Sequence, residues 1–323
     1  MRGISGGRAA SRRGFAVAAG FAFSLSAFAA PSSKDRPAPA DEARALMAAG
    51  KYDEAALRWE EALGAGASNR ELRRGLPSLG RCYEQARNYQ KALTAYQQAL
   101  RFNEKDVDRL LDLARVYQRV ELDSEAVELY KRVLSLDKDR HDARLALARL
   151  YLKTGRWSDA RREGELYAKW EPRDLSGQLL LAQVDEAEGD PVSGAKRREQ
   201  VLAREPSPDG YYDLGRLWAR AGRWDEAEAA FGRAEDLGLR TGAVYLHRGA
   251  ARWLKGDLPG ARAFWKKALD QNSGTGAAHF FLALDAREAG NASETAAELR
   301  RAAAAAQSDF LKSLIKDFPP ARQ

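Results

Sequence analysis

The side chains best suited to nucleophilic or metal chemistry are few in this chain of 323 residues. Cys82 is its one cysteine, and its three histidines are His141, His247 and His279. A single cysteine excludes an intramolecular disulfide and any zinc or iron–sulfur site built from cysteines. Three histidines leave little material for a metal cluster. We therefore expect Cys82 to be a small buried residue and the histidines to be ordinary helical residues.

Catalytic motifs are missing as well. Gly3-Ile4-Ser5-Gly6-Gly7 matches the pattern of a nucleophile elbow, but it follows no strand and lies within a targeting segment. The sequence contains no phosphate-binding loop, no His-Glu-x2-His and no dinucleotide fingerprint. We accordingly predict a protein that is not an enzyme and that has no cofactor, no metal site and no catalytic residue.

The first 29 residues have the composition of an export signal. They carry four arginines and no acidic residue: Arg2, Arg8, Arg12 and Arg13. An apolar run from Phe15 to Ala30 follows, and Ala27-Phe28-Ala29 has the small-x-small pattern of a cleavage site. We predict a signal peptide over residues 1–29 and export to a bacterial periplasm, with an N-terminal anchor facing the periplasm as the alternative.

The route of export stays open at this stage. Ser11-Arg12-Arg13-Gly14-Phe15 resembles the twin-arginine signal of bacteria, but the pair also fits an ordinary basic start. Residues 30–40 contain three prolines and no apolar period, which predicts a flexible linker. We expect no membrane insertion of the mature chain.

The net charge of +7 indicates little about partners once the charges are located. Removing the four arginines of the signal leaves 49 basic against 46 acidic residues, a net +3. Acidic and basic residues alternate in the predicted helices, and export separates the chain from nucleic acid. We therefore do not expect nucleic-acid binding, and the oligomeric state is not indicated.

A repeated motif fills the rest of the chain. Gly50-Lys51-Tyr52-Asp53-Glu54-Ala55 recurs from Gly155 and again from Gly222. Extending it outward gives units that begin at residues 36, 73, 107, 141, 175, 208, 242 and 276. A period of about 34 residues indicates stacked helix pairs.

The columns of these units have physical causes. Position 8 is Gly or Ala in every unit: Ala43, Gly80, Ala114, Ala148, Ala182, Gly215, Gly249 and Ala283. A small residue at a helix crossing allows the axes to approach to about 8–10 Å. Position 24 carries a large ring in five units, and position 15 is Gly in six, which fits a left-handed turn after the first helix.

The period and these columns closely resemble the tetratricopeptide repeat (TPR). Leu76-Pro77-Ser78-Leu79-Gly80-Arg81-Cys82-Tyr83 matches the start of the family motif. The resemblance implies an all-α, right-handed solenoid of about eight helix pairs over residues 41–309, with a capping helix and tail over 310–323. The units are 36–69 (overlapping the linker), 73–106, 107–140, 141–174, 175–207, 208–241, 242–275 and 276–309.

One column of charges is not explained by packing. Position 9, which the resemblance places on the inner, concave surface, is arginine in five units: Arg44, Arg81, Arg115, Arg149 and Arg216. Position 13, one turn later, adds Arg119, Lys153 and Arg220. Like charges at i and i+4 repel mildly, and an anionic partner would offset that repulsion. The predicted partner-binding residues are Arg81, Arg115, Arg119, Arg149, Lys153, Arg216 and Arg220.

Two alternatives remain open for this column. Asp112 and Asp213 lie one turn before Arg115 and Arg216, so internal ion pairs could consume the charges. Beyond the sixth unit the same face turns apolar, and we predict an apolar groove there from Leu246, Trp253, Phe280 and Leu284. Part of that apolar surface is needed to pack the capping helix.

The functional expectation follows from these surfaces. The resemblance implies partner binding, and the predicted export signal places it outside the cytoplasm. We therefore expect an exported scaffold for protein–protein interaction, an accessory to a bacterial cell-envelope assembly, that holds a protein or peptide partner, of acidic character, in the groove. The alternative is a binding protein for an anionic peptide or glycan. The Asn of the chaperone-docking carboxylate clamp is absent, so heat-shock chaperone docking is not expected.

Overall fold

The computed structural model describes residues 38–271 and 275–318, which form 17 α-helices and, within these ranges, no strand. The predicted signal peptide, most of the linker and the last five residues of the predicted tail lie outside the described residues. The predicted all-α repeat solenoid is confirmed.

Sixteen of the helices form eight consecutive pairs, and a short helix follows them. The pairs are α1 (Pro39–Ala48) with α2 (Tyr52–Ala62), α3 (Asn69–Gln85) with α4 (Tyr89–Leu100), α5 (Val107–Arg119) with α6 (Asp123–Leu136), α7 (His141–Lys153) with α8 (Trp157–Trp170), α9 (Ser176–Ala187) with α10 (Pro191–Leu202), α11 (Pro208–Arg220) with α12 (Trp224–Asp236), α13 (Gly242–Leu254) with α14 (Leu258–Asp270), and α15 (Thr275–Glu288) with α16 (Ala292–Ala305). The last helix is α17 (Asp309–Lys316).

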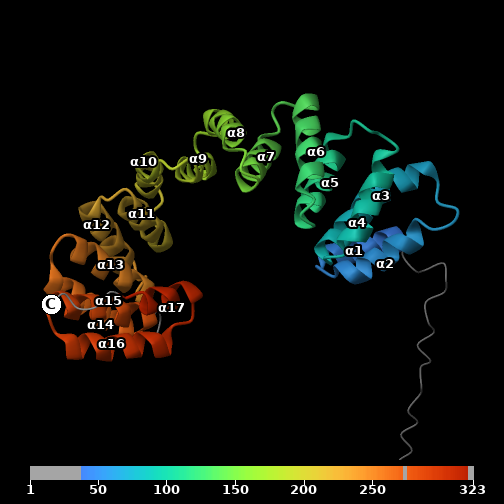
Figure 1. The fold of residues 1–323 in the computed structure, drawn as a ribbon. Helices are drawn as coiled ribbons and strands as arrows, with labels where there is room; N and C mark the ends of the chain where they lie inside the picture. Colours follow the sequence, from blue (N-terminus) through green and yellow to red (C-terminus); the bar gives the residue numbers. More distant parts are fainter. Residues whose placement is uncertain (1–37, 272–274, 319–323) are drawn as a thin grey trace, which may run out of the picture.

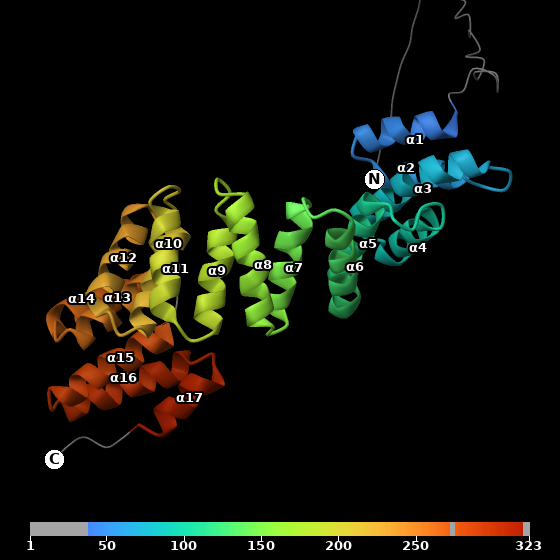
Figure 2. The same ribbon diagram turned by 90° about the horizontal axis from the view of Figure 1, so that it is seen from above.

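The pairs stack side by side into an arc (Figures 1 and 2). First helices of neighbouring pairs touch one another at three places: α7 touches α9, α11 touches α13 and α13 touches α15. Second helices make no comparable contact with one another in the described part of the chain. Because the elements on the inside of a curve lie closer together, the first helices form the inner face and the second helices the outer face.

In units that carry a ring at position 24, the core depends on a close approach between that ring and position 8. A Cβ at Gly80 would lie 2.6 Å from the Tyr96 ring, and one at Gly215 would lie 2.6 Å from the Phe231 ring. Both rings are fully buried. Position 8 is therefore small because the ring of the same unit lies directly against that backbone.

The turn between the helices of a pair uses a left-handed residue at position 15. All six glycines of that column have positive φ, as at Gly50 and Gly155, where φ is 74°. In the second and third units the same conformation is taken by Arg87 (φ 59°) and Glu121 (φ 61°). The fold thus requires this backbone shape even where the sequence does not supply glycine.

Two apolar features lie at the surface. A tryptophan that recurs in the repeat motif, as Trp157 does, is expected in the core, but Trp157 is 42% exposed because it begins α8 and stands at the end of the pair. The capping helix α17 buries none of its residues, and Phe310 is 74% exposed. Only Leu311, Ile315 and Phe318 are partly covered.

Enlarging position 8 should destabilise the fold. Gly215→Ala forces the Phe231 ring away from its site, and we expect a loss of about 1–3 kcal/mol in the free energy of unfolding, measured by denaturant titration. Gly232→Ala is the matched control, since the nearest atom to its added Cβ is Arg248 Nη2 at 3.5 Å. A control as destabilised as Gly215→Ala would contradict the packing argument.

Replacing a non-glycine residue that has the left-handed backbone conformation at position 15 by glycine should stabilise the fold. Glu121→Gly replaces a residue for which this φ costs about 1 kcal/mol, so we expect its melting temperature to rise. Gly155→Ala is the reciprocal variant and should lower it, because nothing lies within 4 Å of the added Cβ and the backbone conformation alone is strained. Equal melting temperatures for both variants would refute the role given to position 15.

Candidate functional site on the inner face

The five arginines at position 9 lie on five first helices and are all exposed. They are Arg44 on α1, Arg81 on α3, Arg115 on α5, Arg149 on α7 and Arg216 on α11. Helix α9 interrupts the column, because Gln183 occupies its position 9. The column therefore runs along the inner face with one gap in the fifth unit.

Four of the seven predicted partner-binding residues are ion-paired within the chain. Arg115 lies 3.4 Å from Asp112 and 3.6 Å from Asp142 of the next first helix. Arg216 lies 3.6 Å from Asp213, Lys153 lies 2.8 Å from Asp123, and Arg220 pairs with Glu186 of α9. Exposed pairs of this kind contribute about 0–1 kcal/mol each, so they do not hold these side chains firmly.

The other three residues have no such partner. Arg81, Arg119 and Arg149 lie within 4.0 Å of no carboxylate among the residues that the structure describes. Both alternatives, internal ion pairing and partner binding, therefore apply to different residues of the column. Internal ion pairs engage four of the predicted residues, and three exposed guanidinium groups stay available to an anionic partner.

The predicted apolar groove is partly occupied by the chain itself. Phe318, which follows α17, meets Phe280 edge to face with 5.7 Å between ring centroids. The Arg287 guanidinium lies over the Phe318 ring, 5.2 Å from its centroid. Leu246 packs against the core of the seventh unit, and Trp253 Nε1 donates to Glu288 at 3.4 Å. Leu284 is half-buried on the same face.

Buried ion pairs between units were not found by sequence reasoning. Asp185 is almost fully buried and accepts hydrogen bonds from Arg161 and Arg197, both at 2.8 Å. Arg198, at the position where five other units carry a ring, is buried and pairs with Asp213 at 3.2 Å. A sequence signal existed for one of these pairs, because Asp185 at position 11 of the fifth unit faces Arg161 at position 21 of the preceding unit. The Arg161–Asp185 and Arg198–Asp213 pairs connect units, and none of the pairs forms a site.

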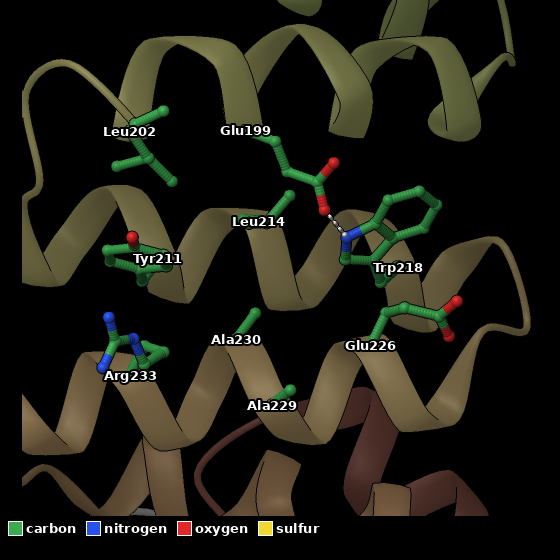
Figure 3. A pocket seen from close by; sticks show the side chains of 10 residues that line it. Glu199, Leu202, Tyr211, Leu214, Trp218, Glu226, Ala229, Ala230 and Arg233 are labelled. Atoms are coloured by element: carbon green, nitrogen blue, oxygen red, sulfur yellow. Dashed lines mark hydrogen bonds between the residues drawn. The ribbon is translucent and has the colours of Figure 1, made fainter.

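The outer face carries two small pockets that sequence reasoning also missed. The α10–α12 pocket, of about 330 Å³, is lined by Glu199, Leu202, Ala203, Tyr211, Leu214, Trp218, Glu226, Ala229, Ala230 and Arg233 (Figure 3). The α2–α4 pocket, of about 340 Å³, is lined by Glu60, Leu63, Leu72, Leu76, Leu79, Tyr83, Lys91, Thr94, Ala95 and Gln98. Each lies between two second helices, with a first helix as its floor.

Of the groups that could do chemistry, Cys82 is fully buried and His247 is half-buried. Burial raises the pKa of the Cys82 thiol to about 11, so the thiolate that would act as a nucleophile is disfavoured. His247 lies between Tyr212 and Phe231 and donates from Nδ1 to the carbonyl of Ala243 at 2.8 Å. Burial, opposed by that hydrogen bond, lowers its pKa below the usual value.

Family models described as tetratricopeptide repeat match most of the described chain. One matches residues 124–184, and another matches 40–107, 179–243 and 212–275. No helix among the residues described is long and apolar enough to cross a membrane. Among curated proteins, none matches the sequence.

Solved structures share the fold at low sequence identity. The C-terminal part of a TPR repeat-containing protein from Cytophaga hutchinsonii is 14% identical, with a TM-score of 0.63 over 72% of this chain and 97% of that one. A tetratricopeptide repeat protein from Parabacteroides merdae is 17% identical, with a TM-score of 0.57 over 76% and 97%. PilW, described as a widely conserved type IV pilus biogenesis factor, is 17% identical, with a TM-score of 0.50 over 62% and 93%.

The burial of His247 predicts acid sensitivity. Because its pKa is lower in the folded than in the unfolded chain, the unfolded state binds more protons, and stability falls as the pH drops below the unfolded value of about 6.5. We expect His247→Phe to lose less unfolding free energy than the parent chain between pH 7.5 and pH 5, by denaturant titration. Equal losses in both proteins would show that His247 does not contribute.

Proposed function

Because the chain belongs to the tetratricopeptide repeat family, we propose that it is an exported scaffold that holds a protein partner on its inner face. TPR domains bind proteins or peptides, and the fold typically serves as a non-catalytic scaffold. The proposed partner segment is acidic. The proposed setting is a cell-envelope assembly of a bacterium, in the periplasm.

The main support for the proposal is the exposure of two arginines on the inner face, Arg81 and Arg149, without ion-pair partners. Both guanidinium groups are exposed and have no ion-paired carboxylate among the described residues, and Arg115 stands between them on the intervening first helix. Guanidinium groups donate in a planar fork that matches carboxylates. An extended acidic segment crossing α3, α5 and α7 would meet one fork on each helix.

The setting is supported by two further observations. Residues 1–29 combine a basic start, an apolar run and a small-residue end, which is the pattern of a secretory signal. PilW, whose fold is similar, is described as a pilus biogenesis factor, which places one structural neighbour in an envelope assembly.

A second candidate is favoured by the same free arginines. A chain that carries an anionic peptide or glycan would use these forks for a small ligand, without any larger assembly. The two candidates differ in what the purified chain binds. A carrier binds a short polyanion by itself, whereas a scaffold requires the wider surface of a folded partner.

Neutralising the free arginines should weaken partner capture. We expect Arg81→Gln with Arg149→Gln to reduce recovery of the crosslinked partner from the native envelope at least fivefold at low salt, with a smaller difference at high salt, because salt screens exposed charges. Recovery is measured by quantitative mass spectrometry after crosslinking in cells.

The matched control removes the same charge elsewhere. Arg101→Gln with Arg240→Gln changes two exposed arginines that lie just after second helices and are not ion-paired within the described ranges. Capture should then be unchanged. If both double variants captured the partner equally well, the inner-face arginines would be merely tolerated and the proposed groove would be refuted.

A further inference from the structure

The two outer pockets occupy equivalent places in the repeat. Glu199 and Glu60 stand at position 25, Trp218 and Tyr83 at position 11 of the following unit, and position 19 is Glu226 in one pocket and Lys91 in the other. In each pocket the ring donates to the glutamate. Trp218 Nε1 lies 3.1 Å from Glu199 Oε1, and the Tyr83 hydroxyl is bonded to Glu60.

Both pockets stay open for the same reason. Position 23 of the unit, on its second helix, is Ala95 in the α2–α4 pocket and Ala230 in the α10–α12 pocket. Other units carry larger side chains at this position, such as Leu129 and Phe264. Leu129 packs against two hydrophobic clusters, and Phe264 is a member of a third.

The α2–α4 pocket already contains a cation of the chain. Lys91 Nζ lies 3.1 Å from Glu60 Oε1 and 5.1 Å from the centroid of the Tyr83 ring. An ammonium between a carboxylate and an aromatic face combines an ion pair with a cation–π contact. This arrangement shows what the pocket geometry accommodates at its ring end.

The α10–α12 pocket lacks that cation. Its position 19 is Glu226, so the indole of Trp218 lies between two carboxylates, Glu199 and Glu226 (Figure 3). Glu199 has no ion-pair partner in the ranges described. Glu226 pairs with Arg223, whose guanidinium lies 5.6 Å from the Trp218 ring centroid. Arg223 and Glu226 are three residues apart at the start of α12, on the surface. Because a surface ion pair contributes little free energy, an incoming cation can replace Arg223 beside Glu226 at low cost.

We propose that the α10–α12 pocket binds a lysine side chain presented by a partner protein. The methylene stem lies on the apolar floor of Leu202, Leu214 and Ala230. The ammonium takes the place that Lys91 occupies in the other pocket, beside Glu199 and the indole ring. Arg233 lies at the opposite end of the pocket (Figure 3) and repels a second cation there.

This site is independent of the inner-face arginines. It lies between second helices, on the outer face, and it selects a basic side chain where the inner face selects an acidic segment. A single lysine subsite is weak by itself, because one cation–π contact at an open pocket contributes little binding free energy. A small probe at millimolar concentration is therefore the appropriate ligand.

The test is a titration of the full chain with acetyl-lysine-methylamide. Binding is monitored by NMR through the nitrogen-15 chemical shift of the Trp218 indole N–H. We expect saturable binding. Acetyl-norleucine-methylamide, which keeps the methylene stem without the ammonium, should bind at least tenfold more weakly. Equal binding of the two probes would show a merely apolar pocket and overturn the proposal.

A reciprocal exchange makes the test specific. Glu226→Lys recreates the occupied pocket and should abolish binding of the lysine probe at Trp218. Lys91→Glu opens the α2–α4 pocket and should create a second site, detected as a doubled stoichiometry by calorimetry. Glu199→Gln, which changes no volume, should weaken binding at least tenfold. Unchanged binding in Glu226→Lys or Glu199→Gln, or an unchanged stoichiometry in Lys91→Glu, would overturn the assignment.

Discussion

The contact of a buried ring with the small residue at position 8 is the constraint on which the solenoid depends. Phe231 against Gly215 and Tyr96 against Gly80 leave no space for a Cβ. The same contact recurs in the seventh unit, where the Trp265 ring lies against Gly249. The helix pairs, stacked in order, produce an arc with first helices inside and second helices outside.

A fold determined at these crossings leaves both surfaces free to vary. The inner face carries exposed charges because none of its position 9 side chains takes part in the core. The outer pockets are lined by alanine at position 23, as at Ala230, whereas Phe264 at the same position belongs to a hydrophobic cluster. The two proposed binding surfaces, of opposite preference, therefore require no change to the core.

The fifth unit shows how the solenoid tolerates a lost ring. Arg198 stands at position 24 and is buried, and its charge is balanced by Asp213 of the next unit. Asp185, also buried, is balanced by arginines from two different helices. Removing one member of such a pair leaves an uncompensated buried charge, which costs far more than an exposed pair contributes. Specific ion pairs replace apolar packing there.

The helix pairs, the crossings and the left-handed turns can be predicted from the amino-acid sequence, because they depend on residues close together in the chain and repeat with a fixed period. The arginine column on one face can be predicted in the same way. Which charges are free depends on the folded chain, since Arg220 pairs with Glu186 and Lys153 with Asp123, contacts between helices that depend on side-chain reach. The outer pockets, and the C-terminal Phe318 lying on Phe280, likewise depend on how neighbouring helices meet in space.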